Sequence, residues 1–278
     1  MTHALAKLIE RRYGLETRLD LGSPVPPALA TMLGRRSCRR YLAQPVPEAL
    51  LEVLLACAQS APSKSDLQQY AIIVVKDPDS RAAISGMTAS MPWIAEAPVF
   101  LMFCADMRRN RRITELRGHA FANDNLDSFV NATADAALAM GGFVAAAEAA
   151  GLGCCPISLV RNHIEAVSTL LALPDCVYPL AGLCAGYPAS AGHVSMRLPP
   201  AVVVHTDRYD DSRLAAEIDA YDRRRHARQP IPPESQRHTD HYGVLDRCHW
   251  SDNVARQLSR PERANFRNFL NRHGFGLA

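Results

Sequence analysis

Several common signatures are missing from this sequence of 278 residues. Its eight cysteines form no CxxC pair and have no histidines at the spacing of zinc ligands, so we expect no metal site. No GxGxxG motif lies between a strand and a helix, and no GxxxxGK motif followed by Ser or Thr occurs. The sequence therefore lacks the usual Gly-rich loops that bind phosphate. No internal repeat is visible either. If Arg35 to Arg40 hold a phosphate, they do so with side chains rather than with a Gly-rich loop.

Charge of one sign and long apolar runs are also scarce. Lys and Arg number 31 against 28 Asp and Glu, which leaves a formal net charge of only +3. The most apolar stretch, residues 129 to 150, is interrupted by Asp135 and Glu148, so we expect no transmembrane helix. The first residues, MTHALAKLIERRYG, are amphipathic and charged, unlike a signal peptide. We therefore expect a cytoplasmic protein with a sizeable core.

Positive charge is concentrated in one stretch, GRRSCRRYLAQPV, at residues 34 to 46. Four arginines surround Ser37 there: Arg35, Arg36, Arg39 and Arg40. Candidate partners are the phosphates of a nucleic acid, the head groups of a membrane and the phosphates of a small cofactor; the alternative is a solvated helix end. A nucleic-acid binder usually carries basic charge over a whole face. The small net charge and the lack of interleaved aromatic residues argue against that partner.

The cysteines are interpreted as reduced core thiols. Most lie in apolar runs such as FLMFCA and LAGLCAG, where a free thiol behaves as a small hydrophobic residue. Only Cys38, among the arginines, has a setting that would stabilise a thiolate. We interpret Cys38 as a neighbour of the arginine cluster rather than as a nucleophile.

Helix and strand patterns alternate along the chain. Helical spacing and helix-start signals indicate helices at residues 3 to 12, from Pro27, after Pro47, at 126 to 150, at 163 to 173 and from Ser259 to Gly274, the last with a Ser259 and Glu262 capping box. Strands are indicated by YAIIVV, APVFLMFCAD, YPLAGLCAGYP and AVVVHTDRY, and GLGCCPISLV is interpreted as a loop and a strand. Residues 223 to 247 show no periodicity and are expected to form an exposed loop. The alternation predicts a mixed α/β layer structure.

Six short motifs occur in a specific order: RRSCRRYLAQPV, SAPSKSDLQQYAIIVV, FCAD, AAEAAGLGCCPISLVRN, LLALPDCVYPLAGLCAGYP and MRLP. In this order the sequence resembles the nitroreductase family, particularly its NADPH-dependent flavin and nitro reductase branch. The resemblance covers roughly residues 33 to 205, with a weaker echo in WSDNV at 250 to 254. It implies an α+β fold, a three-layer α/β/α sandwich with a central mixed, mainly antiparallel sheet.

The resemblance also implies a domain organisation and a homodimer that binds one FMN in each of two interface pockets. A helical extension at residues 1 to 32 would precede an FMN-binding domain at 33 to 222, and an exposed loop with C-terminal helices at 223 to 278 would complete the same domain. The Ala-rich stretch at 126 to 150 has too few large side chains to fill a core by itself. We therefore expect it to pack against its symmetry mate.

By the same resemblance, Arg35 and Ser37 hold the FMN phosphate, with Arg36 close by. The arginine of the MRLP motif, Arg197, reaches the same phosphate from far along the chain. Guanidinium groups suit this role because they bind phosphate bidentately. Arg39 corresponds to the residue that family members place against the pyrimidine edge of the flavin, where a cation stabilises the negative charge that develops upon reduction.

The second motif, PSKSDLQ, resembles the family's loop that touches the ribityl chain and the ring. Its candidate contacts are Ser63, Ser65, Asp66 and Gln68, and loop capping is the alternative role for the two serines. Asp66 stands where many relatives carry Asn. A carboxylate there could accept a hydrogen bond from a ring N–H of the flavin, but its negative charge would disfavour reduction of the ring, which becomes anionic.

The motif AAEAAGLGCCPISLVRN, called the third motif below because it is the third that we assign to flavin contacts, departs most from the family. Relatives often have Tyr-Ile-Gly-Gly beside the reactive edge of the flavin, and this chain has Pro156, Ile157, Ser158 and Leu159. Because proline has no N–H, a donor to the flavin N5 must come from Ile157 or Ser158. Two further departures are Ser195, where a lysine is usual, and Met91, where Gln is common.

The resemblance implies an enzyme in which hydride passes from NADPH or NADH to FMN and then to a nitroaromatic, quinone or flavin acceptor by a ping-pong mechanism. The flavin carries the chemistry, so no side chain is predicted to be catalytic, including His119, His163, His205 and His241. The alternative is a specialised or non-redox member of the same fold, either for flavin storage or as a dedicated metabolite reductase; the altered third motif favours it slightly. A small-molecule electron acceptor is the expected partner, with neither nucleic acid nor membrane.

Overall fold

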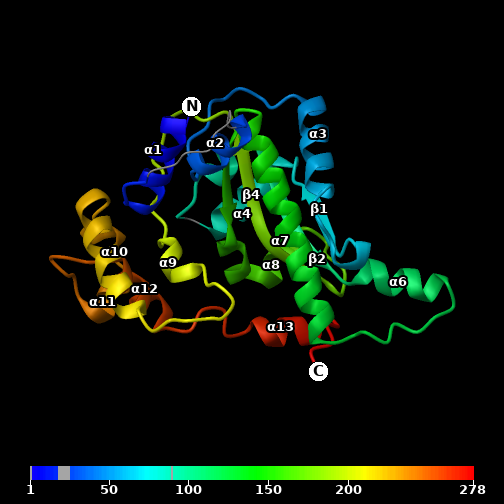
Figure 1. Cartoon of the computed structure of the whole chain (residues 1–278). Coiled ribbons are helices and arrows are strands. Elements are labelled where there is room, and N and C mark those ends of the chain that lie inside the picture. Colours follow the sequence, from blue (N-terminus) through cyan, green and yellow to red (C-terminus); the bar gives the residue numbers. More distant parts are fainter. Residues whose placement is uncertain (1, 18–25, 89) are drawn as a thin grey trace. The chain divides into compact units, whose positions relative to one another are not determined.

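The computed structural model of the chain describes residues 2–17, 26–88 and 90–278 (Figure 1). The chain divides into two compact units, which we describe one at a time. The helical unit comprises Met1–Arg35 and His193–Glu262, and the sheet unit comprises Arg36–Gly192 and Arg263–Ala278. The domain boundaries expected after residues 32 and 222 stay a prediction, because compactness alone does not define a domain.

The sheet unit is built on a four-stranded antiparallel sheet in the order β1-β2-β4-β3. Its strands are β1 (Tyr70–Val74), β2 (Val99–Asp106), β3 (Gly153–Ile157) and β4 (Val177–Gly186). All four lie where apolar runs predicted strands. Within the described residues, the one parallel pairing is an isolated bridge between Ser37 and Cys154. The prediction of a mainly antiparallel sheet is confirmed.

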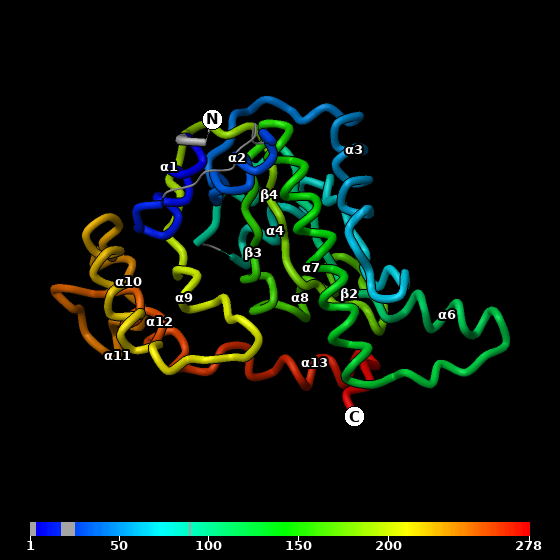
Figure 2. Tube along the Cα trace, in the orientation of Figure 1, coloured from blue at the N-terminus to red at the C-terminus, as the bar shows by residue number. Residues whose placement is uncertain are grey.

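Helices and short 3-10 segments surround this sheet. They are α3 (Glu48–Gln59), η1 (Lys64–Asp66), α4 (Pro78–Met87), α5 (Trp93–Glu96), α6 (Arg108–Leu116), α7 (Leu126–Ala149), η2 (Ser158–His163), α8 (Ile164–Leu170) and α13 (Phe266–Arg272). Figure 2 shows α7 running along the strands with α3 beside it, and these two helices are in extensive contact. Sequence patterns predicted α3, α7 and α8, but they did not indicate α4 or α6.

The strand β2 explains why the sheet is covered on both faces. All eight of its residues are buried. Leu101 and Phe103 belong to the core that includes buried residues of α3 and α7, whereas Phe100 and Met102 belong to a second core with residues of α4, α5 and α8. Successive side chains of a strand point to opposite faces, so a continuously apolar strand needs a helical layer on each side. The predicted three-layer α/β/α arrangement is therefore confirmed in the sheet unit.

The helix α7 is the central helix of the sheet unit. Its buried apolar side chains recur every three to four positions and form one stripe: Ala132, Ala136, Ala139, Phe143 and Ala147. Small side chains let it approach α3 closely, since a Cβ on Gly142 would lie 3.1 Å from the carbonyl oxygen of Cys57. By length and composition α7 is apolar enough to cross a membrane. Its packing against the sheet and α3 places one face of the helix in the core of the sheet unit.

The helical unit contains α1 (Thr2–Tyr13), α2 (Pro27–Gly34), α9 (Pro200–Val203), α10 (Leu214–Arg228), η3 (Pro233–Ser235), α11 (Thr239–Tyr242) and α12 (Trp250–Leu258). α1 packs on α2, and α10 packs on α9 and α12. The buried Tyr221 of α10 meets Trp250 of α12 edge to face, with ring centroids 5.3 Å apart. Aromatic packing thus joins the two longest helices of the C-terminal half of this unit.

Two sequence predictions about the helical unit are wrong. The stretch AVVVHTDRY is not a strand, because its first residues form α9 and no later residue in the described chain belongs to a strand. Val203 and Val204 are 58% and 66% exposed, so β-branched residues here do not mark a buried strand. The expected loop at 223 to 247 begins with the last turns of α10 and also contains α11. The run of arginine and histidine at residues 223–226 interrupts the apolar spacing of α10, so the sequence gives little sign of the helix.

The predicted start of the last helix is also wrong. Ser259 follows α12 as its C-cap, and its hydroxyl donates to the Arg256 carbonyl at 2.7 Å. α13 begins seven residues later, at Phe266, after Asn265. Its predicted end is confirmed, since Gly274 lies just beyond it with a φ of 71°. The Ser-x-x-Glu pattern therefore marked the end of one helix and not the start of another.

Candidate functional site

The first motif runs along the edge strand β3 of the sheet unit. Ser37 forms a parallel bridge with Cys154, and the Cys38 N–H donates to the Cys154 carbonyl at 2.9 Å. This close approach requires Gly153, where a Cβ would lie 2.5 Å from the Cβ of Cys38. The third motif begins two residues further along the same strand. The structure thus brings the first and third motifs together within one unit.

The third motif begins in β3 and continues into η2. Pro156 lies opposite Leu183 of β4, in an edge strand, which is where a sheet tolerates a residue without an N–H. Pro156 and Ser158 are exposed, whereas the Ile157 side chain is only 1% exposed and belongs to the core. Any contact that Ile157 makes with a ligand must therefore use its backbone. Leu159 packs partly buried against the same core.

The arginines of the first motif in the sheet unit are fixed by neutral groups. Arg36 donates from Nε to the carbonyl of Ala191. Arg39 lies over the indole of Trp93, with its Cζ 5.7 Å from the ring centroid. Among the residues that the structure describes, no carboxylate pairs with either arginine or with Arg40. Their charge is therefore available for an external anion.

Cys38 sits among these arginines but is not an activated thiol. It is 8% exposed, and its desolvation raises the pKa of the thiol above the usual value. The nearby charges of Arg36 and Arg39 act in the opposite direction but are the smaller effect. The thiol stays protonated near neutral pH, which agrees with its interpretation as a neighbour of the cluster.

The second motif is held by one buried carboxylate. Asp135 of α7 is 2% exposed and accepts hydrogen bonds from Ser63 Oγ at 2.7 Å, from the Lys64 N–H at 3.0 Å and from the Gln69 N–H at 3.0 Å. The Ser63 oxygen in turn accepts from the Gln68 N–H at 2.7 Å. The hydroxyl of Ser63 is thus used to shape the loop, which is the capping role considered as its alternative.

The loop that Asp135 holds has an unusual backbone. Ser65, Asp66 and Gln68 have φ values of 50°, 57° and 50°, in the left-handed region that residues other than glycine seldom occupy. All three side chains are exposed. Arg109 adds support from α6 by donating to the Gln68 carbonyl at 2.9 Å. Such strain persists only where the surroundings enforce it, and it is concentrated at ligand sites.

Arg35 and Arg197 belong to the helical unit, where the buried side chain of Arg12 joins their segments. Arg12, in the last turn of α1, donates to the carbonyls of Leu33, Arg35 and Ser195 at 2.7, 2.8 and 2.9 Å. Its own carbonyl accepts from the Arg197 N–H at 2.7 Å. The Arg197 side chain is exposed and has no hydrogen-bond or carboxylate partner in the described part of the chain. The backbones of two predicted phosphate ligands thus lie at the same end of α1.

The sequence did not predict the roles of three residues that shape the candidate site. Asp135 did leave a signal, because it is a carboxylate at helical spacing within an apolar run, although its partners were not visible. Arg12 lies seven residues after the buried Leu5 and so shares a helix face with it, but a charged residue at a helix end gives no warning of burial. Nothing in the sequence pattern indicated that Trp93 contacts Arg39.

The structure shows where Met91 and Ser195, the two other departures from the family pattern, lie. Met91 packs partly buried against the core that α4 and α5 cover. Ser195 contributes its backbone carbonyl to the bonds of Arg12. Neither position adds a charge. The described residues contain no group of three His, Cys, Asp or Glu side chains arranged to hold a metal ion.

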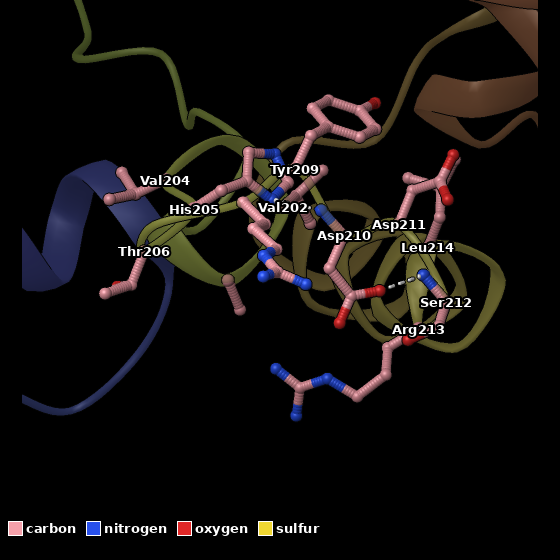
Figure 3. Close-up of a pocket in the computed structure, with 12 residues that line it drawn as sticks. Val202, Val204, His205, Thr206, Tyr209, Asp210, Asp211, Ser212, Arg213 and Leu214 are labelled. Carbon is pink, nitrogen blue, oxygen red and sulfur yellow. Dashed lines mark hydrogen bonds between the residues drawn. The ribbon is translucent and has the colours of Figure 1, made fainter.

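A separate hollow in the helical unit contains none of the predicted cofactor-binding residues (Figure 3). His205 stacks against Tyr209 there with ring centroids 4.4 Å apart, and its Nδ1 accepts from the Asp210 N–H at 3.3 Å. The Asp210 carboxylate accepts from the Ser212 N–H at 2.9 Å, as the dashed line shows. These bonds shape the turn between α9 and α10. His205 is thus a hydrogen-bonded structural residue.

Comparison with known families assigns the chain. The model of the nitroreductase family matches residues 32–187, which is more than half of the chain. This protein belongs to the nitroreductase family. The model of the family's C-terminal domain matches residues 195–278. The nitroreductase resemblance is therefore confirmed, and α1 precedes both matched ranges.

Individual nitroreductase relatives agree with this assignment over nearly their whole length. FMN reductase (NAD(P)H) of Bacillus subtilis strain 168 is 34% identical over 250 residues, which cover 89% of this chain and 97% of the relative. Oxygen-insensitive NADPH nitroreductase of Salmonella typhimurium is 33% identical over 251 residues, which cover 90% and 98%. The solved structure of NfrA2 from B. megaterium has a TM-score of 0.82 at 30% identity and covers 91% of this chain and 100% of its own.

Proposed function

We propose that this nitroreductase is an NAD(P)H-dependent FMN enzyme that transfers hydride from NADPH or NADH to a nitroaromatic, quinone or flavin acceptor by a ping-pong mechanism. Family membership supports the proposal, as do the names of its relatives, FMN reductase and NADPH nitroreductase. The observation that carries it is the exposed Arg197 guanidinium, which pairs with no carboxylate among the described residues. The backbone N–H of Arg197 is linked through Arg12 to the segment of Arg35.

The residues fit the phosphate of FMN. A phosphate needs several strong donors, and arginine supplies them in a planar fork. We propose that Arg35, Arg36, Ser37 and Arg197 bind it. Ser37 and Arg197 are exposed, and Arg36 has no carboxylate partner in the described chain. An external dianion would therefore not compete with an internal ion pair of a described residue at Arg36 or Arg197.

When bound, FMN supplies the hydride and electron transfer at its N5 atom. Arg39 would then lie at the pyrimidine edge, where its charge stabilises the negative charge that develops in the ring. Stacking on Trp93 restricts the Arg39 side chain and so helps to keep this charge in place. The protein's contribution is thus orientation and electrostatics rather than proton transfer by a side chain.

The loop of the second motif would contact the ribityl chain and the ring through Ser65, Asp66 and Gln68, with Ser63 holding the loop in shape. A carboxylate at Asp66 opposes negative charge on the ring, so it would lower the tendency of the flavin to be reduced.

The third motif would lie at the reactive edge of the ring. We propose that Ile157 or Ser158 donates a backbone N–H to N5, because Pro156 has none. Leu159 and Pro156 would line the same edge. The proline is also the observation that favours the alternative function, a flavin-storage protein or a dedicated metabolite reductase.

We further propose a cytoplasmic homodimer whose other partner is a small-molecule electron acceptor, without nucleic acid or membrane. The exposed side of α7 supports the homodimer. Leu126, Val130 and Leu138 are 51%, 53% and 45% exposed there, which leaves large apolar side chains in water in a single chain. A second copy of the protein would cover them, as the sequence predicts.

The visible absorption spectrum of the freshly purified protein, followed by NADPH oxidation with a quinone, tests the proposal. We expect flavin bands and quinone-dependent NADPH oxidation. A protein that stays colourless after incubation with FMN would contradict the proposal. A flavin-containing protein that oxidises neither NADPH nor NADH with any acceptor would favour the storage function.

A further inference from the structure

The helix α1 precedes both ranges that match the nitroreductase models, but it is anchored at the segments that carry Arg35 and Arg197. Arg12, in its last turn, is 9% exposed. A buried guanidinium is costly unless its N–H groups find acceptors. Three backbone carbonyls of two remote segments fulfil this need.

The geometry of these bonds sets a distance between two parts of the chain. Nη2 of Arg12 donates to the carbonyls of Leu33 and Arg35, and Nη1 donates to the carbonyl of Ser195. Because the guanidinium group is planar and rigid, atoms bonded to its two ends keep a fixed separation. The Arg197 N–H, bonded to the Arg12 carbonyl, adds a fourth connection.

A second, independent contact locates the end of α1 on the same segment. Gly14 follows the helix with a φ of 68°, and a Cβ there would lie 2.5 Å from the methyl carbon of Met196. The chain therefore passes directly over the residue between Ser195 and Arg197. Elsewhere α1 is held by the buried Leu5 and by the ion pair of Glu10 with Arg228, 3.4 Å apart. Docking of the helix thus does not rest on Arg12 alone.

We propose that Arg12 is a positioning residue for the phosphate of the cofactor. It holds the backbones of Arg35 and Arg197 at a fixed separation, so that both guanidinium groups meet a single phosphate dianion. Arg12 itself acts through these two arginines and does not bind the cofactor. This inference rests on the proposed function, in which Arg35 and Arg197 bind the FMN phosphate.

The test compares two flavins that differ only in the phosphate. Apo protein is titrated with FMN and with riboflavin by fluorescence, for the wild type, Arg12→Met and Arg11→Met. Arg11 is the matched control, since it is the exposed neighbour on α1. Loss of the guanidinium at position 12 should weaken FMN binding about tenfold and leave riboflavin binding within about twofold. Arg11→Met should change neither affinity.

A merely structural role gives a different pattern. If Arg12→Met weakens FMN and riboflavin equally, or weakens neither, while circular dichroism shows a folded protein, the inference is wrong. If that variant does not fold, Arg12→Lys serves instead, because it keeps the charge but loses the rigid fork; its FMN affinity should fall and its riboflavin affinity should not. Equal changes in both affinities would overturn the inference here too.

A double variant tests whether Arg12 acts through Arg197. Adding Arg12→Met to Arg197→Ala should cost clearly less FMN affinity than Arg12→Met costs in the wild type, because one of the two positioned groups is already missing. Full additivity would contradict the inference. A different result would contradict the proposed function, namely that wild-type apo protein binds FMN no more tightly than riboflavin. A wild type that prefers FMN and an Arg12→Met protein with the same preference would exclude only the role of Arg12.

Discussion

Each of the two units has a region that is predicted to contact the cofactor and is held by one buried charged side chain, but the two charges are opposite. In the sheet unit, Asp135 accepts from three donors within residues 63–69. In the helical unit, Arg12 donates to carbonyls of two segments that lie far apart in the sequence. The carboxylate therefore fixes the shape of one loop, whereas the guanidinium fixes the separation of two segments. Loss of each should have a different signature.

The largest effect is expected at Asp135. Asp135→Asn should lower the free energy of unfolding by about 3 kcal/mol, because the amide keeps one acceptor oxygen and turns an NH2 group toward donors in a buried site. Urea denaturation measures the change. Asp127→Asn is the matched control on the same helix, where the exposed carboxylate accepts from Asn131 at 2.8 Å, and it should cost less than about 1 kcal/mol. If the two variants lose the same free energy of unfolding, the buried hydrogen bonds of Asp135 do not have the stabilising role assigned to them.

The next effect concerns Ser63, which connects Asp135 to the loop. Ser63→Ala removes a donor to the carboxylate and the acceptor of the Gln68 N–H, so we expect a loss of about 1 to 2 kcal/mol in urea denaturation. The affinities for FMN and riboflavin should fall together, because this loop is assigned to the ribityl chain and ring. A loss of FMN affinity alone would mean that the loop contacts the phosphate. The loop would then have the same ligand contact as the segments that Arg12 holds.

The smallest effect is expected for Ser65→Gly, at a position whose φ of 50° is enforced by the loop. Ser65→Gly relieves left-handed strain but makes the unfolded chain more flexible, so the free energy of unfolding should change by less than about 0.5 kcal/mol. Ser65→Val should lower it by about 1 to 2 kcal/mol, because a β-branched residue is poorly tolerated at positive φ. Thermal and urea unfolding of both variants check this. If the two substitutions prove equivalent, the loop is not held in that conformation in solution.

The sheet unit was largely predictable from the sequence, and its physical simplicity explains why. Runs such as APVFLMFCAD are apolar without interruption, which favours a strand covered on both faces, and β2 is such a strand. The stripe of small residues in α7 also left a clear pattern. The motifs of the family then indicated which loop residues are candidates for cofactor contacts. They did not show that Ser63 is hydrogen-bonded to Asp135.

The helical unit was much less predictable. α10 has five arginine and histidine side chains in its C-terminal half and buries only Tyr221 and Asp222, so its apolar periodicity is weak. The burial of Arg12 depends on carbonyls at Leu33 and Ser195, which no local pattern connects to α1. Backbone acceptors have no sequence signature, since every residue has one. The positioning of a site by such contacts becomes visible only in the structure.

A fluorescence titration of apo Arg197→Ala with FMN and with riboflavin shows whether Arg197 binds the phosphate of FMN. We expect wild-type protein to bind FMN more tightly than riboflavin. Arg197→Ala should raise the FMN dissociation constant about ten- to a hundredfold, as expected for the loss of a charge-assisted bond, and leave riboflavin binding unchanged. If the variant weakens the binding of both flavins equally, the Arg197 guanidinium does not contact the phosphate.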